Sequence, residues 1–503
     1  MAFAITQTCC ADATCVSVCP VNCIHPTPEE RAFGNTEMLY IDPRSCIDCG
    51  ACADACPVDA VRPVLTLTGP EQAYATINAD YFEGTEPARR AEDSPTLHAW
   101  GAPHFDRVLG ADFPRLRVAV IGSGPAGMYA AEDLILHTDA EVTVIDRLPV
   151  PDGLVRFGVA PDHPATKQVA EKFHRLHQHP RVRLALGVEV GDGLTHEDLL
   201  EHHDAVIYAV GAPADRRLGV PGEDLPGSLP ATTVVGWYNG HPDVAADAVD
   251  LDTERVVVVG TGNVALDVAR VLLSAPEDVA ATAIAPHALT ALRTSKVREV
   301  VLLARRGPEH AAWTRPEILA LRHLPGIELV VDDHDPRIGA TIDDAARDSK
   351  PATLQGVARR VFDWTLPPAP GRRIVVRFLA TPTEVRGDLE TRALVVSDGV
   401  GTTEIATARV IRAIGHRGQP VPGLPWDEQS ATVPHEAGRV DGVRGAYVAG
   451  WIKRGPSGGI GTNRRCAGES VGTLLDDVLA GRVSTGAGKR RGLGRLLSRA
   501  RNR

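Results

Sequence analysis

Two short apolar runs in the chain each lead into a glycine-rich turn. Residues 116–121 precede Gly122-Ser-Gly124-Pro-Ala-Gly127 and a helical stretch at 128–136, and residues 255–259 precede Gly260-Thr-Gly262-Asn-Val-Ala265. Apolar runs of this length are typical of buried parallel strands. Glycines at these spacings let the backbone approach a pyrophosphate bound at the helix N-terminus. The pattern therefore predicts an α/β fold with two Rossmann-like dinucleotide-binding domains.

The residues after the next strand of each unit indicate which dinucleotide binds. The run 141–145 ends in Asp146, 22 residues after Gly124, where an acid holds a ribose hydroxyl. The run 300–303 is followed by Arg305 and Arg306 and by no acid. Arginines bind a 2′-phosphate, which an acid would repel. We therefore predict FAD at the first unit and NADPH at the second, the alternative for the arginines being a helix-capping pair.

The remaining pattern divides the chain into domains. Apolar runs at 205–210 and 446–449 would complete the first sheet after the second unit has been inserted into it. Residues 63–115 show no sustained periodicity and predict a connector with local structure. The expected parts are a head (1–62), a linker (63–115), an FAD-binding domain (116–250 and 405–480), an NADP-binding domain (251–404) and a tail (481–503).

The composition is that of a globular protein, with 44% hydrophobic and 23% charged residues. At roughly 100–200 residues per domain, the length of 503 residues implies about three domains. No run approaches the ~18 apolar residues of a membrane helix. The first residues lack a basic region followed by an apolar run, which a secretory signal needs. We therefore expect a cytoplasmic protein without a membrane span.

The ten cysteines are concentrated in the head, where nine lie between Cys9 and Cys56. In a large chain without a secretory signal, such a cluster indicates metal binding rather than disulfides. The run Cys46-Ile-Asp-Cys49-Gly-Ala-Cys52-Ala-Asp-Ala-Cys56-Pro57 fits the C-x2-C-x2-C-x3-C-P pattern that holds iron–sulfur clusters in bacterial ferredoxins. A zinc site is the alternative, but zinc usually takes two separated cysteine pairs.

A second, altered run supplies ligands for a second cluster. Cys15 and Cys19 form its C-x3-C-P ending, and counting back places Cys9 first and Asp12 second. Because the last cysteine of each run ligates the other cluster, one 4Fe–4S cluster is expected on four cysteines: Cys19, Cys46, Cys49 and Cys52. The other cluster is expected on Cys9, Cys15 and Cys56, with Asp12 in place of a fourth cysteine.

Asp12 decides what the second cluster is. A carboxylate binds cluster iron more weakly than a thiolate, so the second site is either a 3Fe–4S cluster or a 4Fe–4S cluster with one labile iron. The alternative is that Asp12 is a solvated surface acid. Cys10 and Cys23 fall outside the pattern and are expected to pack near the clusters, although Cys10 could replace Cys9.

The net charge of −11 is distributed unevenly. Residues 1–60 hold eight acidic residues against two arginines, whereas the last 22 residues hold eight basic residues and no acid. We expect the acidic head to meet a basic surface of the nucleotide-binding domains, with Lys453 and Arg454 as contributors. The basic tail is expected to be solvated and not to bind nucleic acid, because it lacks interleaved aromatic residues.

Longer strings of the sequence resemble known families. Residues 116–480 resemble the adrenodoxin-reductase group of ferredoxin–NADP reductases in four strings, which begin at Gly153, Gly262, Arg305 and Gly450. The head resembles the seven-iron and eight-iron bacterial ferredoxins, which are small α+β proteins. The whole chain resembles the ferredoxin/ferredoxin–NADP reductase fusions.

The resemblance implies roles for individual residues. The FAD residues are expected to include Gly122, Gly124, Ala126, Asp146, Leu154 and Val190, with Trp451, Gly458, Gly459 and Ile460 near the isoalloxazine. The NADPH residues are expected to be Asn263, Val264, Ala265, Arg305, Arg306 and Glu317, together with Gly458. His163 and Asp267 are candidates for proton handling, with a structural turn and plain packing as their alternatives. Two departures from the family pattern are Asp146, where Glu is commoner, and Pro316, which precedes Glu317.

The implied activity is that of a ferredoxin–NADP(+) reductase. NADPH donates a hydride to FAD, and the electrons pass singly to the ferredoxin-type clusters and then to a ferredoxin or another redox protein. One alternative is a flavin and iron–sulfur subunit like the small subunit of glutamate synthase, which feeds another enzyme. Another is a redox sensor without significant turnover.

Overall fold

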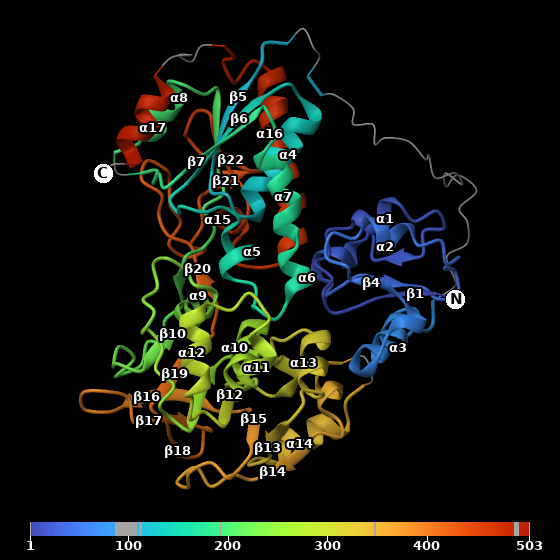
Figure 1. Cartoon of the computed structure of the whole chain (residues 1–503), viewed down its shortest axis with the longest axis vertical. Coiled ribbons are helices and arrows are strands. Elements are labelled where there is room, and N and C mark those ends of the chain that lie inside the picture. Colours follow the sequence, from blue (N-terminus) through green and yellow to red (C-terminus); the bar gives the residue numbers. More distant parts are fainter. Residues whose placement is uncertain are drawn as a thin grey trace.

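The computed structural model describes residues 2–85, 108–109, 113–191, 193–346, 349–486 and 492–501. Two α/β domains lie one above the other, and a small head packs beside the place where they meet (Figure 1). In the part of the chain that is described, no helix has both the length and the apolar character needed to cross a membrane.

The upper domain is built on a seven-stranded sheet in the order β21-β22-β23-β8-β5-β6-β7. Its last five strands are parallel, and β21 and β22 form an antiparallel edge. The strands are β5 (Arg117–Ile121), β6 (Glu141–Asp146), β7 (Val182–Leu186), β8 (Ala205–Tyr208), β21 (His435–Glu436), β22 (Arg439–Val440) and β23 (Ala446–Val448). The runs predicted at 205–210 and 446–449 thus join the first sheet.

Helices cover this sheet and bring their N-termini to its carboxyl edge. The longest, α16 (Ile460–Leu479), packs against α4 (Pro125–His137), which follows the first glycine-rich turn. Buried Val118, Met128 and Leu474 lie in the core that these elements share. The other helices are α5 (Gly153–Phe157), α6 (Pro164–Lys167), α7 (Val169–His177), α8 (His196–Leu200) and α15 (Trp451–Arg454).

The lower domain is built on a parallel seven-stranded sheet in the order β10-β19-β11-β12-β15-β13-β14. Its strands are β10 (Ser228–Pro230), β11 (Arg255–Val259), β12 (Glu299–Leu303), β13 (Ile327–Asp332), β14 (Ala358–Arg360), β15 (Arg372–Arg377) and β19 (Arg409–Arg412). Its α-helices are α9 (Ala231–Asn239), α10 (Asn263–Leu273), α11 (Pro276–Val279), α12 (Pro286–Arg293), α13 (Arg315–Leu321) and α14 (Pro336–Asp343). A small antiparallel sheet joins β16 (Thr381–Arg386), β17 (Ala393–Ser397) and β18 (Thr402–Ala406). These sheets confirm the predicted fold class.

Two domain boundaries differ from the prediction. Strands β10 and β19 pair with each other and β19 pairs with β11, so both belong to the lower sheet although they lie outside 251–404. A three- or four-residue strand carries little periodicity of its own, and its partner decides its domain. The two-stranded link between β9 (Ala214–Asp215) and β20 (His416–Arg417) marks where the chain passes between the domains.

The head contains two short sheets and extends further than predicted. Strand β1 (Phe3–Ile5) pairs with β4 (Val61–Pro63), and β2 (Ile24–His25) pairs with β3 (Tyr40–Ile41). Helices α1 (Thr14–Ser17) and α2 (Ala51–Ala55) carry cysteines.

Helix α3 (Ala73–Asp80) lies in the predicted linker but packs on the head. The Oδ1 atom of Asn78 accepts hydrogen bonds from the N–H groups of Ile5 and Ile41, at 3.0 and 2.9 Å. The head therefore continues to residue 85, and of the predicted linker, residues 86–107 and 110–112 lie outside the described residues.

The tail is also not simply solvated. Residues 492–501 include the amphipathic helix α17 (Leu493–Arg501), whose Leu497 is buried in the core of the upper domain beside Leu493 and Leu496. The arginines of this helix were the reason to expect a solvated segment, but leucines four residues apart place one apolar face on the domain. Residues 487–491 and 502–503 lie outside the described part.

Candidate functional site

Four loops meet at the carboxyl edge of the upper sheet, and glycines in three of them allow the backbones to touch. Gly122 has φ +105°, and a Cβ atom there would lie 2.4 Å from the carbonyl oxygen of Ala209. A Cβ on Gly153 would lie 2.9 Å from Cα of Gly124, and one on Gly450 would lie 2.6 Å from Cβ of Ala126. Side chains would fill this space, so the loops form a backbone-lined cradle at the start of α4, as a bound pyrophosphate requires.

Asp146 lies beside this cradle, at the end of β6. Its Oδ2 accepts hydrogen bonds from the backbone N–H and the hydroxyl of Ser123, at 2.7 and 2.6 Å, and its Oδ1 accepts one from the N–H of Leu148. Leu154 on α5 is 44% exposed at the same edge, as expected for an apolar side chain that a cofactor covers. Val190 is half-buried next to Gly191. These residues fit the adenosine and pyrophosphate side of FAD.

The other end of the cradle is the N-terminus of α16. Gly459 is the N-cap residue of this helix, Ile460 is its first residue, and Gly458 has φ +74°. Trp451 begins α15, donates from Nε1 to the carbonyl oxygen of Ser457 at 3.1 Å, and packs against the His416 ring, 5.1 Å between centroids. A helix N-terminus favours negative charge, so this arrangement fits the electron-rich ring of a reduced flavin. No motif in the sequence indicates a role for His416.

The lower domain repeats the cradle. Gly260 has φ +127°, and a Cβ there would lie 2.2 Å from the carbonyl oxygen of Ala413. Asn263, the first residue of α10, exchanges hydrogen bonds with Thr314: the N–H of Thr314 donates to Oδ1 at 2.9 Å, and Nδ2 donates to the hydroxyl at 3.1 Å. Val264 is 37% exposed there, whereas Ala265 is fully buried.

Arg305 and Arg306 follow β12 and are both exposed. Neither guanidinium forms an ion pair with an acid within the described parts of the chain, so both are available to an anion. Their place at the carboxyl end of a parallel strand fits the 2′-phosphate of NADP.

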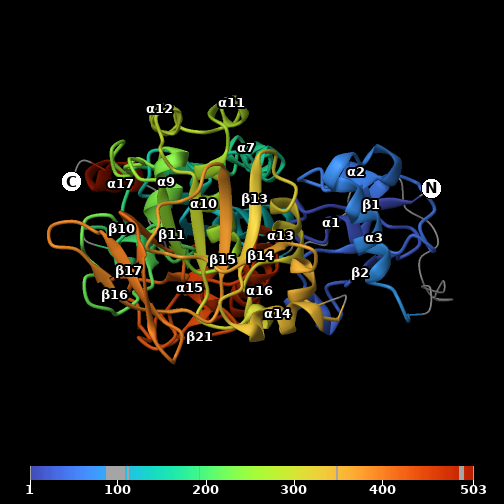
Figure 2. The same ribbon diagram turned by 90° about the horizontal axis from the view of Figure 1, so that it is seen from below.

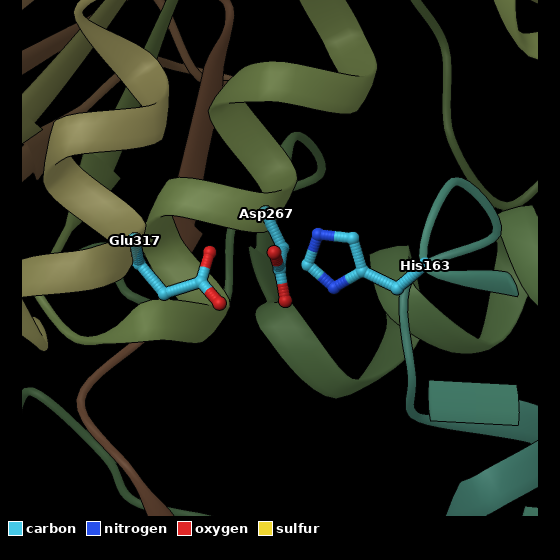
Figure 3. Close-up of side chains that lie close together, drawn as sticks. All are labelled: His163, Asp267 and Glu317. Carbon is cyan, nitrogen blue, oxygen red and sulfur yellow. The ribbon is translucent and has the colours of Figure 1, made fainter. Parts of the chain in front are cut away.

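Between the two cradles lie three titratable side chains from three elements. His163 is the N-cap residue of α6 in the upper domain, and Asp267 and Glu317 project from α10 and α13 of the lower domain. One donor atom of each lies within 4.8 Å of the others, and Figure 3 shows Asp267 between the other two. The structure thus brings together the two candidates for proton handling and the carboxylate expected to touch NADPH.

A buried arginine, which the sequence analysis did not single out, organises this cluster. Arg270 lies one turn after Asp267 on α10 and donates to both oxygens of Asp162, at 2.6 and 3.0 Å, and to Asp267 at 2.8 Å. Its Nη1 is also 3.9 Å from Glu317. Three carboxylates and a histidine could in principle hold a cation, but Arg270 already supplies the positive charge among them.

Burial sets the protonation states of the cluster. Burial and then the neighbouring Asp267 raise the pKa of Glu317 to about 7, against the opposing charge of Arg270. Burial and then Arg270 lower the pKa of His163, so its imidazole is neutral at neutral pH. The buried Tyr238 hydroxyl, whose pKa is also raised by burial, has no hydrogen-bond partner among the described residues.

Pro316 precedes Glu317 within helix α13. The proline occupies the first turn of α13, where its missing N–H is no loss. Glu317, the next residue, lies near Asp267 and 3.9 Å from a guanidinium nitrogen of Arg270, both on α10.

The four cysteines predicted for the first cluster surround one recess in the head. Cys19, Cys46, Cys49 and Cys52 line it with Phe3, Val21, Ile47, Gly50 and Cys23. Cys23, expected to pack near the clusters, is buried with its Sγ 3.5 Å from that of Cys19. We call Cys19, Cys46, Cys49 and Cys52 the outer cysteine set.

The second predicted ligand group, Cys9, Cys15 and Cys56 with Asp12, is called the inner cysteine set. Burial and, to a smaller extent, the acidic neighbours raise the pKa of each of its three thiols, to about 11 for Cys9. Three thiolates beside a carboxylate therefore need a cation among them, and iron would supply it. This chemistry fits a cluster.

Asp12 is not a solvated acid. Its side chain is 6% exposed, it accepts hydrogen bonds from the N–H and the hydroxyl of Thr14, and it lies 4.0 Å from a guanidinium nitrogen of Arg464 on α16. Its role as an iron ligand stays a prediction.

The head contacts both nucleotide-binding domains, and both views place it beside α13 (Figures 1 and 2). The N–H of Gly461 on α16 donates to the carbonyl oxygen of Cys10 at 3.0 Å. Glu37 accepts a hydrogen bond from the N–H of Arg315 at 2.8 Å and lies 3.7 Å from Nζ of Lys350. The hydroxyl of Tyr74 donates to the carbonyl oxygen of Pro316 at 3.3 Å.

The cations that lie beside the acids of the head are not the predicted Lys453 and Arg454. Lys453 is buried inside the upper domain, where its Nζ donates to Glu469 and Ser470 at 2.8 and 2.9 Å. Arg454 donates to Asn463 at 3.1 Å. The acids of the head meet Arg464 and Lys350 instead, which shows that the sign of the charge was predicted correctly and the residues were wrong.

Comparisons with known proteins agree with this division. Residues 116–305 match the pyridine nucleotide-disulphide oxidoreductase family, and residues 39–62 match the 4Fe-4S binding domain. A probable ferredoxin/ferredoxin–NADP reductase of Mycobacterium tuberculosis is 48% identical over 500 residues, which cover 96% of this chain and 85% of that protein. Its counterpart in Mycobacterium leprae is 44% identical over 497 residues, covering 96% and 87%.

A solved structure is similar to the two larger domains. FprA of Mycobacterium tuberculosis has a TM-score of 0.70 at 40% identity, covering 77% of this chain and 90% of that one, and it was also solved in complex with NADPH. Fold and site together define an NADP-dependent flavoprotein oxidoreductase joined to a ferredoxin-type iron–sulfur domain. The chain belongs to the family of ferredoxin/ferredoxin–NADP reductases.

Proposed function

We propose that this chain is a ferredoxin–NADP(+) reductase that carries its own ferredoxin. It takes electrons from NADPH and passes them through FAD to iron–sulfur clusters in its head, and from there to a ferredoxin or another redox protein. The observation that carries the proposal is the contact between the cysteine-rich turn at Cys10 and the N-terminus of α16, at the flavin end of the FAD cradle. The names of the relatives point to the same activity.

FAD would be held by the cradle at Gly122 and Gly124, by Asp146 and by the N-terminus of α16, and NADPH by α10 and the two arginines. When both cofactors are bound, NADPH would supply a hydride to the flavin, and the flavin would supply electrons one at a time. The chain's own residues orient the two cofactors and keep water from the point where the domains meet.

The buried cluster of His163, Asp267, Glu317 and Arg270 determines the charge between the two cradles. His163 is neutral, so it can donate or accept a hydrogen bond without adding charge to the cluster. The positive charge of the cluster comes from Arg270. Glu317 is able to change its charge near neutral pH, since its pKa is about 7. We propose that it faces the nicotinamide, where positive charge develops as the hydride leaves.

The head is proposed to hold one 4Fe–4S cluster on the outer cysteine set. A second cluster, of the 4Fe–4S or the 3Fe–4S type, is proposed for the inner cysteine set with Asp12. Low-temperature EPR of the oxidised and the dithionite-reduced protein distinguishes the two types, because a 3Fe cluster gives its signal in the oxidised state.

Anaerobic titration of the holoprotein with NADPH tests the proposed activity. The expected result is bleaching of the flavin followed by bleaching of the clusters, and a much weaker response to NADH. Flavin bleaching without any reduction of the clusters or of an added ferredoxin would contradict the proposal. It would favour a flavoprotein that delivers electrons elsewhere.

A further inference from the structure

A close backbone contact between the head and the reductase lies at Gly461, the second residue of α16. Besides the hydrogen bond from its N–H to Cys10, a Cβ atom at this position would lie 2.3 Å from the carbonyl oxygen of Cys10 and 2.4 Å from backbone atoms of Ala11 and Asp12. No side chain fits there. Gly461 has ordinary helical backbone, so glycine is needed for space and not for conformation.

The turn that docks on Gly461 belongs to the inner cysteine set. Cys9 directly precedes it and Asp12 closes it, and the Asp12 carboxylate faces Arg464 one helical turn further along α16. The guanidinium of Arg464 lies over the Tyr129 ring of α4, 5.7 Å from the centroid, and 4.0 Å from Glu132. The inner set thus sits on the two helices whose N-termini form the FAD cradle.

The outer cysteine set reaches solvent. Cys49 is exposed, and the neighbouring Ile47 is 55% exposed. The two sets therefore have different surroundings. The inner set contacts the FAD-binding domain, whereas the outer set is accessible to a partner protein.

We propose, resting on the proposed function, that the inner set holds the entry cluster and the outer set holds the exit cluster, with Gly461 as the residue that positions the head. In this arrangement Cys9, Cys15, Cys56 and Asp12 would hold the cluster that accepts the two electrons of each hydride one at a time. The outer cysteine set would hold the cluster that delivers them singly to an external one-electron acceptor. The accompanying proton goes to solvent. The rate of electron tunnelling falls steeply with distance. A gap opened at Gly461 would therefore slow only the transfer from the flavin site to the inner cluster.

This order has a consequence for the external acceptor. The head occupies the surface of α16 nearest the flavin, so another ferredoxin cannot reach the same surface while the head is docked. The acceptor takes its electrons from the outer set instead.

Two matched variants of the full-length holoprotein test the docking. Gly461→Val puts a side chain into the contact, whereas Gly472→Val changes the same helix at a position where a Cβ meets no atom within 4 Å. We expect G461V to raise hydrogen exchange in residues 9–17 and to slow cluster reduction by NADPH at least tenfold relative to the rate of flavin bleaching in the same variant, with both rates expressed per bound FAD. G472V should match the wild type in all of these measurements. Unchanged exchange and unchanged cluster reduction in G461V would overturn the proposal.

A third variant tests the order. Cys49→Ala removes the exposed ligand of the outer set, and NADPH should then still reduce the inner cluster at the wild-type rate, followed by EPR, while reduction of added cytochrome c falls at least tenfold. Loss of inner-cluster reduction together with normal flavin bleaching would reverse the order and overturn the proposal. Absence of flavin bleaching in the wild type would instead contradict the proposed function, so the two failures are distinguishable.

Discussion

Arg305 and Arg306 are exposed guanidiniums at the end of a buried strand, and neither is paired with an acid in the described parts of the chain. Replacing both with alanine should raise the KM for NADPH roughly 10- to 100-fold, because hydrogen bonds to charged groups contribute about 1.5–3 kcal/mol. The KM for NADH should change little, since NADH has no 2′-phosphate. Steady-state kinetics with an excess of acceptor measures both.

Arg392→Ala is the matched control, because Arg392 is an exposed arginine of the same domain, 68% exposed and paired with Asp388. It should leave both KM values unchanged. An equal loss of affinity for NADPH and NADH in the double variant would argue that the arginines stabilise the domain rather than bind the phosphate.

The raised pKa of Glu317 predicts that the rate of flavin reduction by NADPH depends on pH. Its pKa is raised to about 7 by burial, so the carboxylate becomes charged as pH rises through that value. A negative charge beside the nicotinamide stabilises the positive ring that forms when the hydride leaves, and flavin reduction should therefore become several-fold faster across this range. His163 does not add an inflection above pH 7, because its pKa is lowered.

Anaerobic stopped-flow measurements of flavin reduction between pH 5.5 and about 8.5 test this dependence. Glu317→Gln should remove the inflection and keep the rate near the low-pH value of the wild type. The same inflection in E317Q would show that another group titrates there.

Single residues were predictable where the chemistry is local in the sequence. Asp146 and Asn263 follow from the glycine turns, and the inner and outer cysteine sets follow from spacing. Arg270 has only a weak local signal, an acid three residues earlier on the same helix. Its bond to Asp162 crosses between domains and could not be predicted, whereas Cys23 lies beside Cys19, as its expected packing near the clusters implies.

At the scale of elements, α3 shows how a segment without periodicity can belong to a core. Asn78→Ala should destabilise the head by about 2–4 kcal/mol, because it leaves the buried N–H groups of Ile5 and Ile41 without an acceptor. Urea unfolding, followed by the absorbance of the clusters, measures the change.

Thr76→Ala is the control for this prediction, since Thr76 is exposed on the same helix. It should shift the unfolding midpoint little. If Asn78→Ala also leaves the midpoint unchanged, residues 73–80 are not an integral part of the head.

The long strands and the helices after the glycine turns were predicted closely, because buried parallel strands are continuous apolar runs. Strands β10 and β19 and helix α17 were assigned to the wrong parts. Each is defined by what it packs against, and such tertiary partners leave little trace in a window of three to nine residues.

At the scale of the whole molecule, the head bridges the two nucleotide-binding domains through Glu37, Tyr74 and the turn at Cys10. Charge distribution predicted an acidic head on a basic surface. It could not predict which cations meet it, because Lys453 is buried by the fold and Lys350 is brought near Glu37 only by the arrangement of the domains.

The central claim is that electrons from NADPH reach the clusters within one chain. Anaerobic rapid mixing with excess NADPH, repeated over a wide range of protein concentrations, tests it most directly. A docked head predicts a first-order rate of cluster reduction that does not change on dilution, because the donor and acceptor sites are held together. A rate that falls in proportion to protein concentration would contradict the claim, since electrons would then pass between molecules.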